Sequence, residues 1–183
     1  MNRSAEISED GLYRYRLDRW WGDGPRVAWI MLNPSTADAE VDDPTIRRCI
    51  AFTKAWGYDG LTVVNLYPLR ATDPKALDGF EERATEACAT RNGIEVGRAI
   101  GVSPIAVAAW GVHGARDGIG EWMRGQIALS TPRPLYHLGL TKEGYPRHPL
   151  YVRGDTKPIP WAAPADAPGD EAQQAATRED ETK

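Results

Sequence analysis

The sequence predicts an α/β fold, a three-layer αβα sandwich with a largely parallel central sheet. Short, continuously apolar segments recur along the chain, and segments with apolar residues at helical spacing separate them. Continuous apolar runs are typical of strands that are covered on both faces. Strands that alternate with helices indicate a parallel sheet with helical crossovers. The length of 183 residues suits one domain that is large enough to bury a core.

The first elements have clear boundaries. Residues 13–17 alternate between apolar and charged side chains, which predicts a half-buried edge strand. Residues 26–32 form a continuous apolar run and predict a strand covered on both faces. A helix is predicted next, because Asp43 is a typical cap, Pro44 suits the first turn and Gly57 ends the helical spacing.

Further apolar segments predict three more strands, and the segments between them predict two helices. The strands are expected at residues 60–69, 104–110 and 134–140, and the helices from Glu81–Glu82 to about Ala99 and from His113 to about Leu129. Residues 141–158 are dense in glycine, proline and charge, which predicts a loop. Ligands of parallel sheets bind at the carboxyl ends of the strands. The polar residues that follow the strands are therefore the candidates for chemistry.

Charge divides the chain into two parts. The net charge of −4 resides in residues 163–183, which hold six acidic and two basic residues and no aromatic or branched aliphatic one. This composition predicts a disordered acidic tail. Residues 1–162 form the single predicted domain, which is neutral with 20 acidic and 20 basic residues. A neutral domain excludes a strongly basic nucleic-acid binder but still allows a local basic face.

Composition and missing motifs exclude several other classes. No apolar run reaches the roughly 18 residues of a spanning helix, and the N-terminus is polar and acidic, unlike a secretory signal. Cys49 and Cys88 are too few for a four-thiolate iron–sulfur cluster and fit a reducing, cytoplasmic location. The three histidines lack metal-ligand spacing, and the GxSxG, Walker and GxGxxG motifs are absent. We therefore expect no metal, no cofactor and no membrane partner.

Distinctive polar residues follow four of the predicted strands. They are Asn33 and Ser35 after the first buried strand, Asn65 at the end of the second, Trp110 to His113 after the third, and His148 to Tyr151 beyond the last. Taken singly, each has a structural explanation: a turn, a satisfied buried amide, the first turn of a helix or a rigid loop. Together they become informative through their order.

In this order the four segments resemble the motifs of the uracil-DNA glycosylase superfamily. LNPS at residues 32–35 is similar to its first motif, LTVVN at 61–65 to its second, AAWGVHGA at 108–115 to its third, and HPLY at 148–151 to its His-Pro loop. The resemblance implies a uracil-DNA-glycosylase-like fold and an enzyme that hydrolyses the N-glycosidic bond of a pyrimidine or modified pyrimidine. The run from Trp29 to Pro74 also resembles an uncharacterised bacterial and phage family, a domain of unknown function, which implies no activity.

The resemblance implies a role for each motif residue. Asn33 would position the attacking water, and His148 would stabilise the charge that develops on the leaving base. Asn65 would read the edge of the base, since an amide both donates and accepts hydrogen bonds. Ser35 stands where the uracil-specific branch has a bulky tyrosine, which leaves room for a larger or modified pyrimidine.

DNA would be held by residues around this pocket. Leu150 or Tyr151 would be the apolar wedge that fills the gap left by a flipped base. Four arginines are candidate phosphate contacts, namely Arg47, Arg48, Arg70 and Arg147.

Two departures from the motifs keep other functions open. Residues 36–51 contain no aromatic residue to stack on a base, a contact worth about 1–3 kcal/mol, and Asn33 cannot ionise to act as a base. The first alternative is therefore a non-catalytic module that binds a nucleic acid or nucleotide. The second is a hydrolase or transferase of a free nucleotide or nucleoside, with Asp38 or Asp42 as the general base. Asp43 of the same acidic cluster is predicted to be the helix cap.

Overall fold

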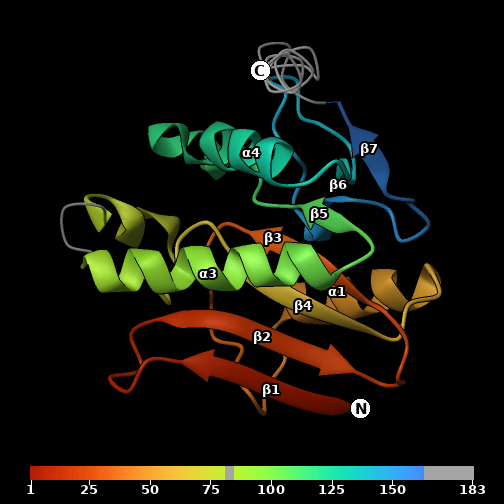
Figure 1. Cartoon of the computed structure of the whole chain (residues 1–183), viewed down its shortest axis with the longest axis horizontal. Helices are drawn as coiled ribbons and strands as arrows, with labels where there is room; N and C mark the ends of the chain where they lie inside the picture. The colour runs from red at the N-terminus through yellow and green to blue at the C-terminus, as the bar shows by residue number, and fades with distance from the viewer. Residues whose placement is uncertain (81–84, 163–183) are drawn as a thin grey trace, which may run out of the picture.

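Seven strands form one mixed sheet in the computed structural model, which describes residues 1–80 and 85–162 (Figure 1). They are β1 (Asn2–Ile7), β2 (Arg14–Trp20), β3 (Arg26–Met31), β4 (Gly60–Asn65), β5 (Ala106–Ala108), β6 (Leu135–His137) and β7 (Ile159–Trp161), in the spatial order β1-β2-β4-β3-β5-β6-β7. The strands β4, β3, β5 and β6 are parallel, whereas β1, β2 and β7 run antiparallel to their neighbours. The sheet is therefore parallel at its centre and antiparallel at both edges.

The N-terminal hairpin corrects the prediction for residues 13–17. The strand there is β2, and it is not an edge strand, because β1 pairs with one side of it and β4 with the other. The sequence pattern misses β1 because its residues are mostly polar and backbone pairing holds them. Two of the buried polar side chains of β2, Asp18 and Arg19, have side-chain partners. Asp18 accepts a hydrogen bond from Thr62 Oγ1 at 2.7 Å, and Arg19 Nε donates to Asp42 at 2.7 Å.

Helices cover both faces of the sheet (Figure 1). One face carries α1 (Pro44–Ala55), and the opposite face carries α3 (Glu86–Val102) and α4 (Ile119–Ser130). The side chain of Asp43 accepts a hydrogen bond from the backbone N–H of Ile46 at 2.8 Å, which confirms the predicted cap of α1. Each face of the sheet has its own hydrophobic core.

Aromatic packing joins α1 to β3. Trp29 is fully buried, and its ring stacks on that of Trp56 with 5.4 Å between centroids. Its indole Nε1 also donates to Thr53 Oγ1 at 3.0 Å. Truncating a buried tryptophan typically costs about 3–5 kcal/mol. This contact therefore holds α1 against β3.

The helix α3 has a defined cap. Thr85 Oγ1 accepts a hydrogen bond from the backbone N–H of Cys88 at 3.2 Å, so the helix begins at Glu86. The predicted start at residues 81–82 falls outside the described residues, and the helix continues past its predicted end. Cys49 and Cys88 are buried on α1 and α3, as expected for helix-core positions.

The region after β5 also differs from the prediction. Residues 112–118 form 3₁₀ turns, and α4 begins only at Ile119, because Asp117 and Gly118 adopt positive φ angles of 51° and 70°. The short strand β7 follows the predicted loop and pairs with β6, a non-local contact that no local pattern announces. The predicted tail, residues 163–183, lies outside the described part of the chain. No helix among the described residues is long and apolar enough to cross a membrane.

Candidate functional site

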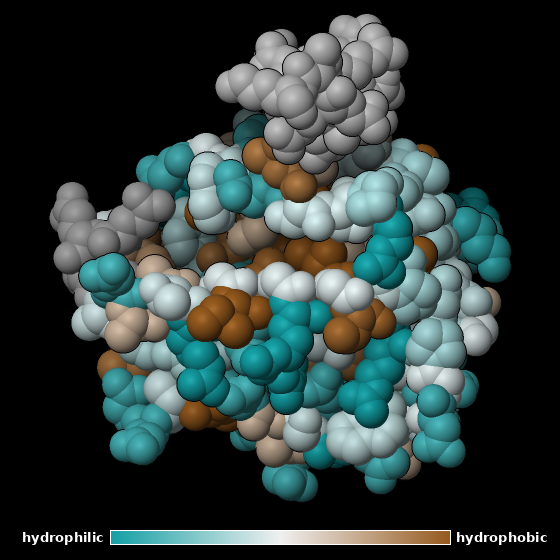
Figure 2. Space-filling view, in the orientation of Figure 1, coloured by the Kyte–Doolittle hydropathy of each residue, from teal (hydrophilic) through white to brown (hydrophobic). Residues whose placement is uncertain are grey.

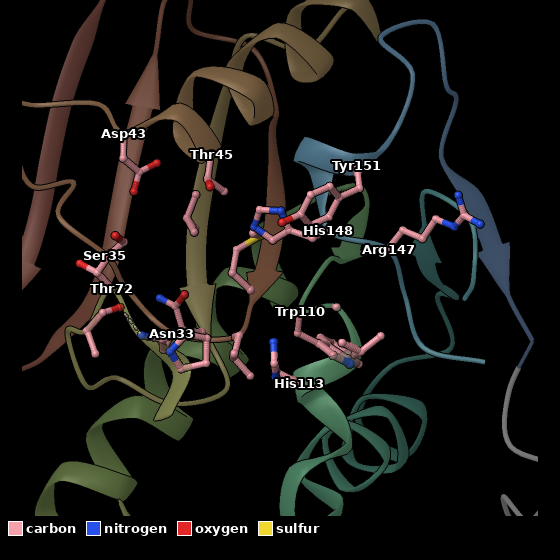
Figure 3. A pocket seen from close by; sticks show the side chains of 18 of the residues that line it. Asn33, Ser35, Asp43, Thr45, Thr72, Trp110, His113, Arg147, His148 and Tyr151 are labelled. Atoms are coloured by element: carbon pink, nitrogen blue, oxygen red, sulfur yellow. Dashed lines mark hydrogen bonds between the residues drawn. The ribbon is translucent and has the colours of Figure 1, made fainter. Parts of the chain in front are cut away.

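A cavity of about 830 Å³ lies at the carboxyl ends of the parallel strands (Figure 3). Asn33 beyond β3, Asn65 at the end of β4 and Trp110 beyond β5 contribute to its walls. From β3 the chain goes first to β4 on one side and then to β5 on the other, so the strand order reverses beside β3. Ligands of open α/β sheets bind at such reversal points. The volume also falls in the range of about 300–1,000 Å³ found for small-molecule sites.

This cavity gathers half of the site residues predicted from the sequence. Asn33, Ser35, Asn65, Arg147, His148 and Tyr151 line it. Leu150, Arg47, Arg48, Arg70, Asp38 and Asp42 are not part of its lining. The motif residues after the parallel strands therefore converge, whereas most of the predicted phosphate contacts and both alternative acids lie elsewhere.

Asn65 is fully buried at the cavity, and its side chain is unpaired. Neither Nδ2 nor Oδ1 has a hydrogen-bond partner among the described residues. The backbone carbonyl of Asn65, in contrast, accepts a hydrogen bond from Asn92 Nδ2 at 3.0 Å, which holds the end of β4 in place. Leaving a buried polar group unpaired costs about 1–3 kcal/mol. The described part of the chain therefore does not satisfy the side-chain amide of Asn65.

The amide of Asn33 is oriented by the backbone (Figure 3). Its Nδ2 donates to the carbonyl of Ala71 at 2.8 Å and to that of Pro34 at 3.1 Å. These bonds tie the loop after β3 to the segment after β4 and leave Oδ1 as the remaining polar atom of the side chain. An amide oxygen accepts a hydrogen bond from water but cannot remove its proton. Asn33 is thus suited to orienting water, and any general base that removes its proton must be another group.

His148 is held as a neutral imidazole. Its Nδ1 accepts a hydrogen bond from the backbone N–H of Leu150 at 3.4 Å, which caps the 3₁₀ turn Pro149–Tyr151. Burial lowers the pKa of His148 below its ordinary value, and the nearby carboxylate of Asp43 opposes this shift. A neutral ring whose Nδ1 accepts a hydrogen bond carries its proton on Nε2. His148 therefore offers an uncharged N–H donor at the cavity wall.

Gly111 places the loop that carries His148. Its φ of 72° is in the left-handed region, where glycine is favoured. Its backbone N–H donates to the carbonyl of Pro146 at 3.0 Å, and a Cβ added at this position would lie 3.7 Å from the Cβ of His148. The glycine of the predicted Trp-Gly-x-His segment thus links the end of β5 to the His-Pro loop.

The structure places four further charged residues in the cavity lining, the exposed Lys142 and Glu143 and the less exposed Arg14 and Asp43. Arg14 is only 2% exposed, and its Nη1 donates to the carbonyl of Ala37 at 2.7 Å, while its Nε has no partner among the described residues. Burial lowers the pKa of Arg14 to about 10, so it stays charged at neutral pH. The alternation of residues 13–17 hid Arg14, because it assigned this side chain to a solvent-exposed face.

Asp43 has two roles that share one carboxylate. Oδ1 caps α1, and the second oxygen is left for the cavity. In the view of Figure 3, Asp43 lies on the same side of the cavity as Asn33 and Ser35, and His148 and Tyr151 lie across from it. The strong capping signal explains why the sequence points to Asp43 as a cap alone.

The two acids that the sequence offers as alternative bases have structural partners. Asp38 accepts hydrogen bonds from the backbone N–H groups of Glu40 at 2.8 Å and Val41 at 2.9 Å, which lower the pKa of its carboxyl group. Asp42 pairs with the buried guanidinium of Arg19. Of the acidic cluster at residues 38–43, Asp43 is the member that reaches the cavity.

All four predicted phosphate contacts donate to backbone carbonyls. Arg47 donates to the carbonyl of Asp42, Arg48 to that of Val152 and Arg70 to that of Gly11. The fourth, Arg147, lines the cavity, and its Nε donates to the carbonyl of Leu140 at 3.1 Å.

A second cavity of about 560 Å³ lies between α3 and α4, where Figure 2 shows apolar residues exposed in a groove. Its lining is mostly apolar, and its buried amide, Asn92, is used to hold the end of β4.

Neither cavity contains a metal centre, because residues 1–80 and 85–162 hold no group of three or more His, Cys, Asp or Glu side chains arranged to bind one. The first cavity is therefore the candidate site.

Comparison with known proteins shows the family of the chain. No curated protein and no solved structure matches it significantly. A family model described as a protein of unknown function, DUF1643, matches residues 14–150, a range that includes β2 to β6 and most of the residues around the cavity. The chain therefore belongs to the DUF1643 family of proteins of unknown function.

Proposed function

We propose that the protein binds a pyrimidine or modified pyrimidine base in this cavity and hydrolyses its N-glycosidic bond. The observation that carries the proposal is the buried, unpaired amide of Asn65. An asparagine amide presents a donor and an acceptor side by side, which matches the adjacent acceptor and donor on the edge of a pyrimidine. A bound base would pair both groups and remove the cost of leaving them unpaired. The order of the four motif segments, similar to that of uracil-DNA glycosylases, supports the same function.

His148 is suited to stabilising the leaving base. When the bond between the sugar and the base breaks, its electron pair stays on the base, and negative charge spreads to the carbonyl oxygen beside the broken bond. A neutral Nε2–H can donate a hydrogen bond to that oxygen, and this bond strengthens as the negative charge develops. The hydrogen bond from Leu150 to Nδ1 keeps the proton on the required nitrogen.

Water activation falls to Asn33 and Asp43. The Oδ1 of Asn33 accepts a hydrogen bond from the water. The free carboxylate oxygen of Asp43 removes the other proton of the water as the water attacks the anomeric carbon. The products are a sugar with a new hydroxyl group and a base that regains a proton from solvent. The cavity supplies both groups from the loop that follows β3.

The lining also allows a base larger than uracil. Ser35 is small, and the rings of Trp110 and Tyr151 offer aromatic surface in the cavity, although residues 36–51 hold none. We therefore include 5-substituted pyrimidines among the substrates.

Base release tests the proposal. The full chain is incubated with single-stranded and duplex oligonucleotides that carry uracil, 5-hydroxymethyluracil or mismatched thymine, and with the matching nucleosides and nucleotides. Free base is measured by chromatography and abasic sites by alkaline cleavage. We expect base release that is lost in Asn65→Leu and His148→Gln and kept in Arg153→Ala, a change in an exposed ion pair outside the cavity.

The non-catalytic alternative makes a different prediction for the same samples. If binding of the base depends on Asn65 but the base is never cleaved from its sugar, the site is a binding module. If neither binding nor release depends on Asn65, the proposal is wrong.

A further inference from the structure

We infer that Arg14 binds a phosphate group of the ligand, so that the ligand of the cavity is a free nucleotide rather than a base within DNA. The inference rests on the proposed function, because it takes the base to lie at Asn65. It identifies the chemistry at another part of the same cavity, where no role has been assigned to the buried guanidinium.

The two buried arginines of β2 differ in one respect. Arg19 is fully buried and pairs with Asp42 at 2.7 Å, as a buried guanidinium normally requires. Arg14 is almost as deeply buried, but no carboxylate of residues 1–80 or 85–162 lies within ion-pair distance of it. Its partners are a single carbonyl, that of Ala37, and its Nε is unpaired. Arg14 is thus a buried cation that lines a cavity and lacks an anion.

Charges of both signs surround Arg14. Asp43 and Asp38 act on it favourably from a distance, and Arg70 and Arg19 act against it. Neither acid neutralises it by direct contact, and Asp38 is outside the cavity lining. An incoming phosphate would give Arg14 the charge-assisted hydrogen bonds that it lacks.

A polymer fits these observations less well than a monomer. Arg47, Arg48 and Arg70 do not line the cavity, and neither does Leu150, one of the two predicted wedge residues. Successive DNA phosphates are normally held by free surface cations. A volume of about 830 Å³ instead suits a whole small molecule.

Calorimetric binding to the full chain at pH 7.5 tests the inference with four probes. They are uridine, uridine 5′-monophosphate, ribose 5-phosphate and a single-stranded oligonucleotide that contains uracil. We expect the monophosphate to bind at least about tenfold more tightly than uridine, as one charge-assisted contact provides. We also expect measurable binding of ribose 5-phosphate. Arg14→Gln should abolish both effects, and Arg153→Ala, a change in an exposed ion pair outside the cavity, should preserve them.

Several results would overturn the inference. These are equal affinity of the wild-type protein for uridine and its monophosphate, tighter binding of the oligonucleotide than of the monophosphate, or a preference for the monophosphate that Arg14→Gln retains. The wild-type comparison decides the matter even where Arg14→Gln does not fold. Binding of ribose 5-phosphate without binding of uridine supports the Arg14 site and contradicts the proposed base site, so the two proposals fail separately.

Discussion

Asn92 on α3 donates from Nδ2 to the backbone carbonyl of Asn65 at 3.0 Å, so one buried asparagine supports the backbone of another. The amide groups of the two side chains differ in their hydrogen bonding. The amide nitrogen of Asn92 also donates to the carbonyl of Leu66 at 3.2 Å, whereas the amide of Asn65 bonds to nothing among the described residues. Asn92 Nδ2 thus holds the end of β4, whereas the amide of Asn65 is the group that we propose binds the base.

Replacing each asparagine by leucine should separate stability from binding. Asn65→Leu removes two unpaired polar atoms from a buried position, so the free energy of unfolding should be unchanged or rise by about 1 kcal/mol, while base binding is lost. Asn92→Leu leaves two carbonyls without their donor and should lower the free energy of unfolding by about 1–3 kcal/mol. Chemical denaturation and calorimetric titration of a pyrimidine nucleoside measure the two effects. A large loss of stability in Asn65→Leu would show that its amide is structural.

The buried His137 and the half-buried His148 predict a shared pH dependence. Burial lowers the pKa of both His148 and His137, and the Nδ1 of His137 accepts a hydrogen bond from the N–H of Gly139 at 2.9 Å. Below pH 6.5 each ring takes up a proton in the unfolded chain before it does so in the folded one. The free energy of unfolding should therefore fall as the pH falls through this window and level off below the lowered pKa.

The matched variants His148→Gln and His137→Gln test which histidine serves the cavity. Each should reduce the pH dependence of unfolding between pH 6.5 and 5, measured by urea denaturation. Only His148→Gln should also abolish base release, since His137 is not part of the cavity lining. Equal loss of base release in both variants would contradict the role of His148.

Local patterns predict the centre of this fold and non-local contacts decide its edges. The strands β3 and β4 and the helix α1 follow from continuous apolar runs and an Asp-Pro cap, which are signals within a few neighbouring residues. The strand β1 has mostly polar residues and is held by its hairpin pairing with β2, so its hydrophobic pattern does not reveal it. The strand β7 has only three residues, and its partner β6 is distant in the sequence.

The same division applies to the site. The order of motifs predicts that Asn33, Asn65 and His148 belong together, and they do line one cavity. Arg14 escapes prediction because β1 and the loop around Ala37 convert a formally exposed position into a buried one. Whether these residues perform the proposed chemistry stays a prediction for experiment.

Asp43→Asn should separate the cap of α1 from water activation. Asparagine caps a helix about as well as aspartate, so the free energy of unfolding should change by less than about 0.5 kcal/mol. The carboxylate is lost, and base release should fall by about 10²–10⁴-fold, the usual contribution of a general base. Asp42→Asn is the comparison, since it removes the partner of the buried Arg19 and should destabilise the fold by about 3–5 kcal/mol. Full activity of Asp43→Asn would show that another group removes the proton of the attacking water.

Gly114→Ala should displace Trp110 from the cavity wall. A Cβ at Gly114 would lie 1.9 Å from the Cδ1 of Trp110, a buried ring that must then shift. We expect a loss of about 1–3 kcal/mol of stability, as for other overpacked cores, with a change in tryptophan fluorescence and weaker ligand binding. Gly93→Ala is the control, because nothing lies within 4 Å of its added Cβ and alanine favours the interior of α3 by about 0.5–1 kcal/mol. Unaltered binding in Gly114→Ala with the expected loss of stability would show that the ring of Trp110 supports the core without contacting the ligand.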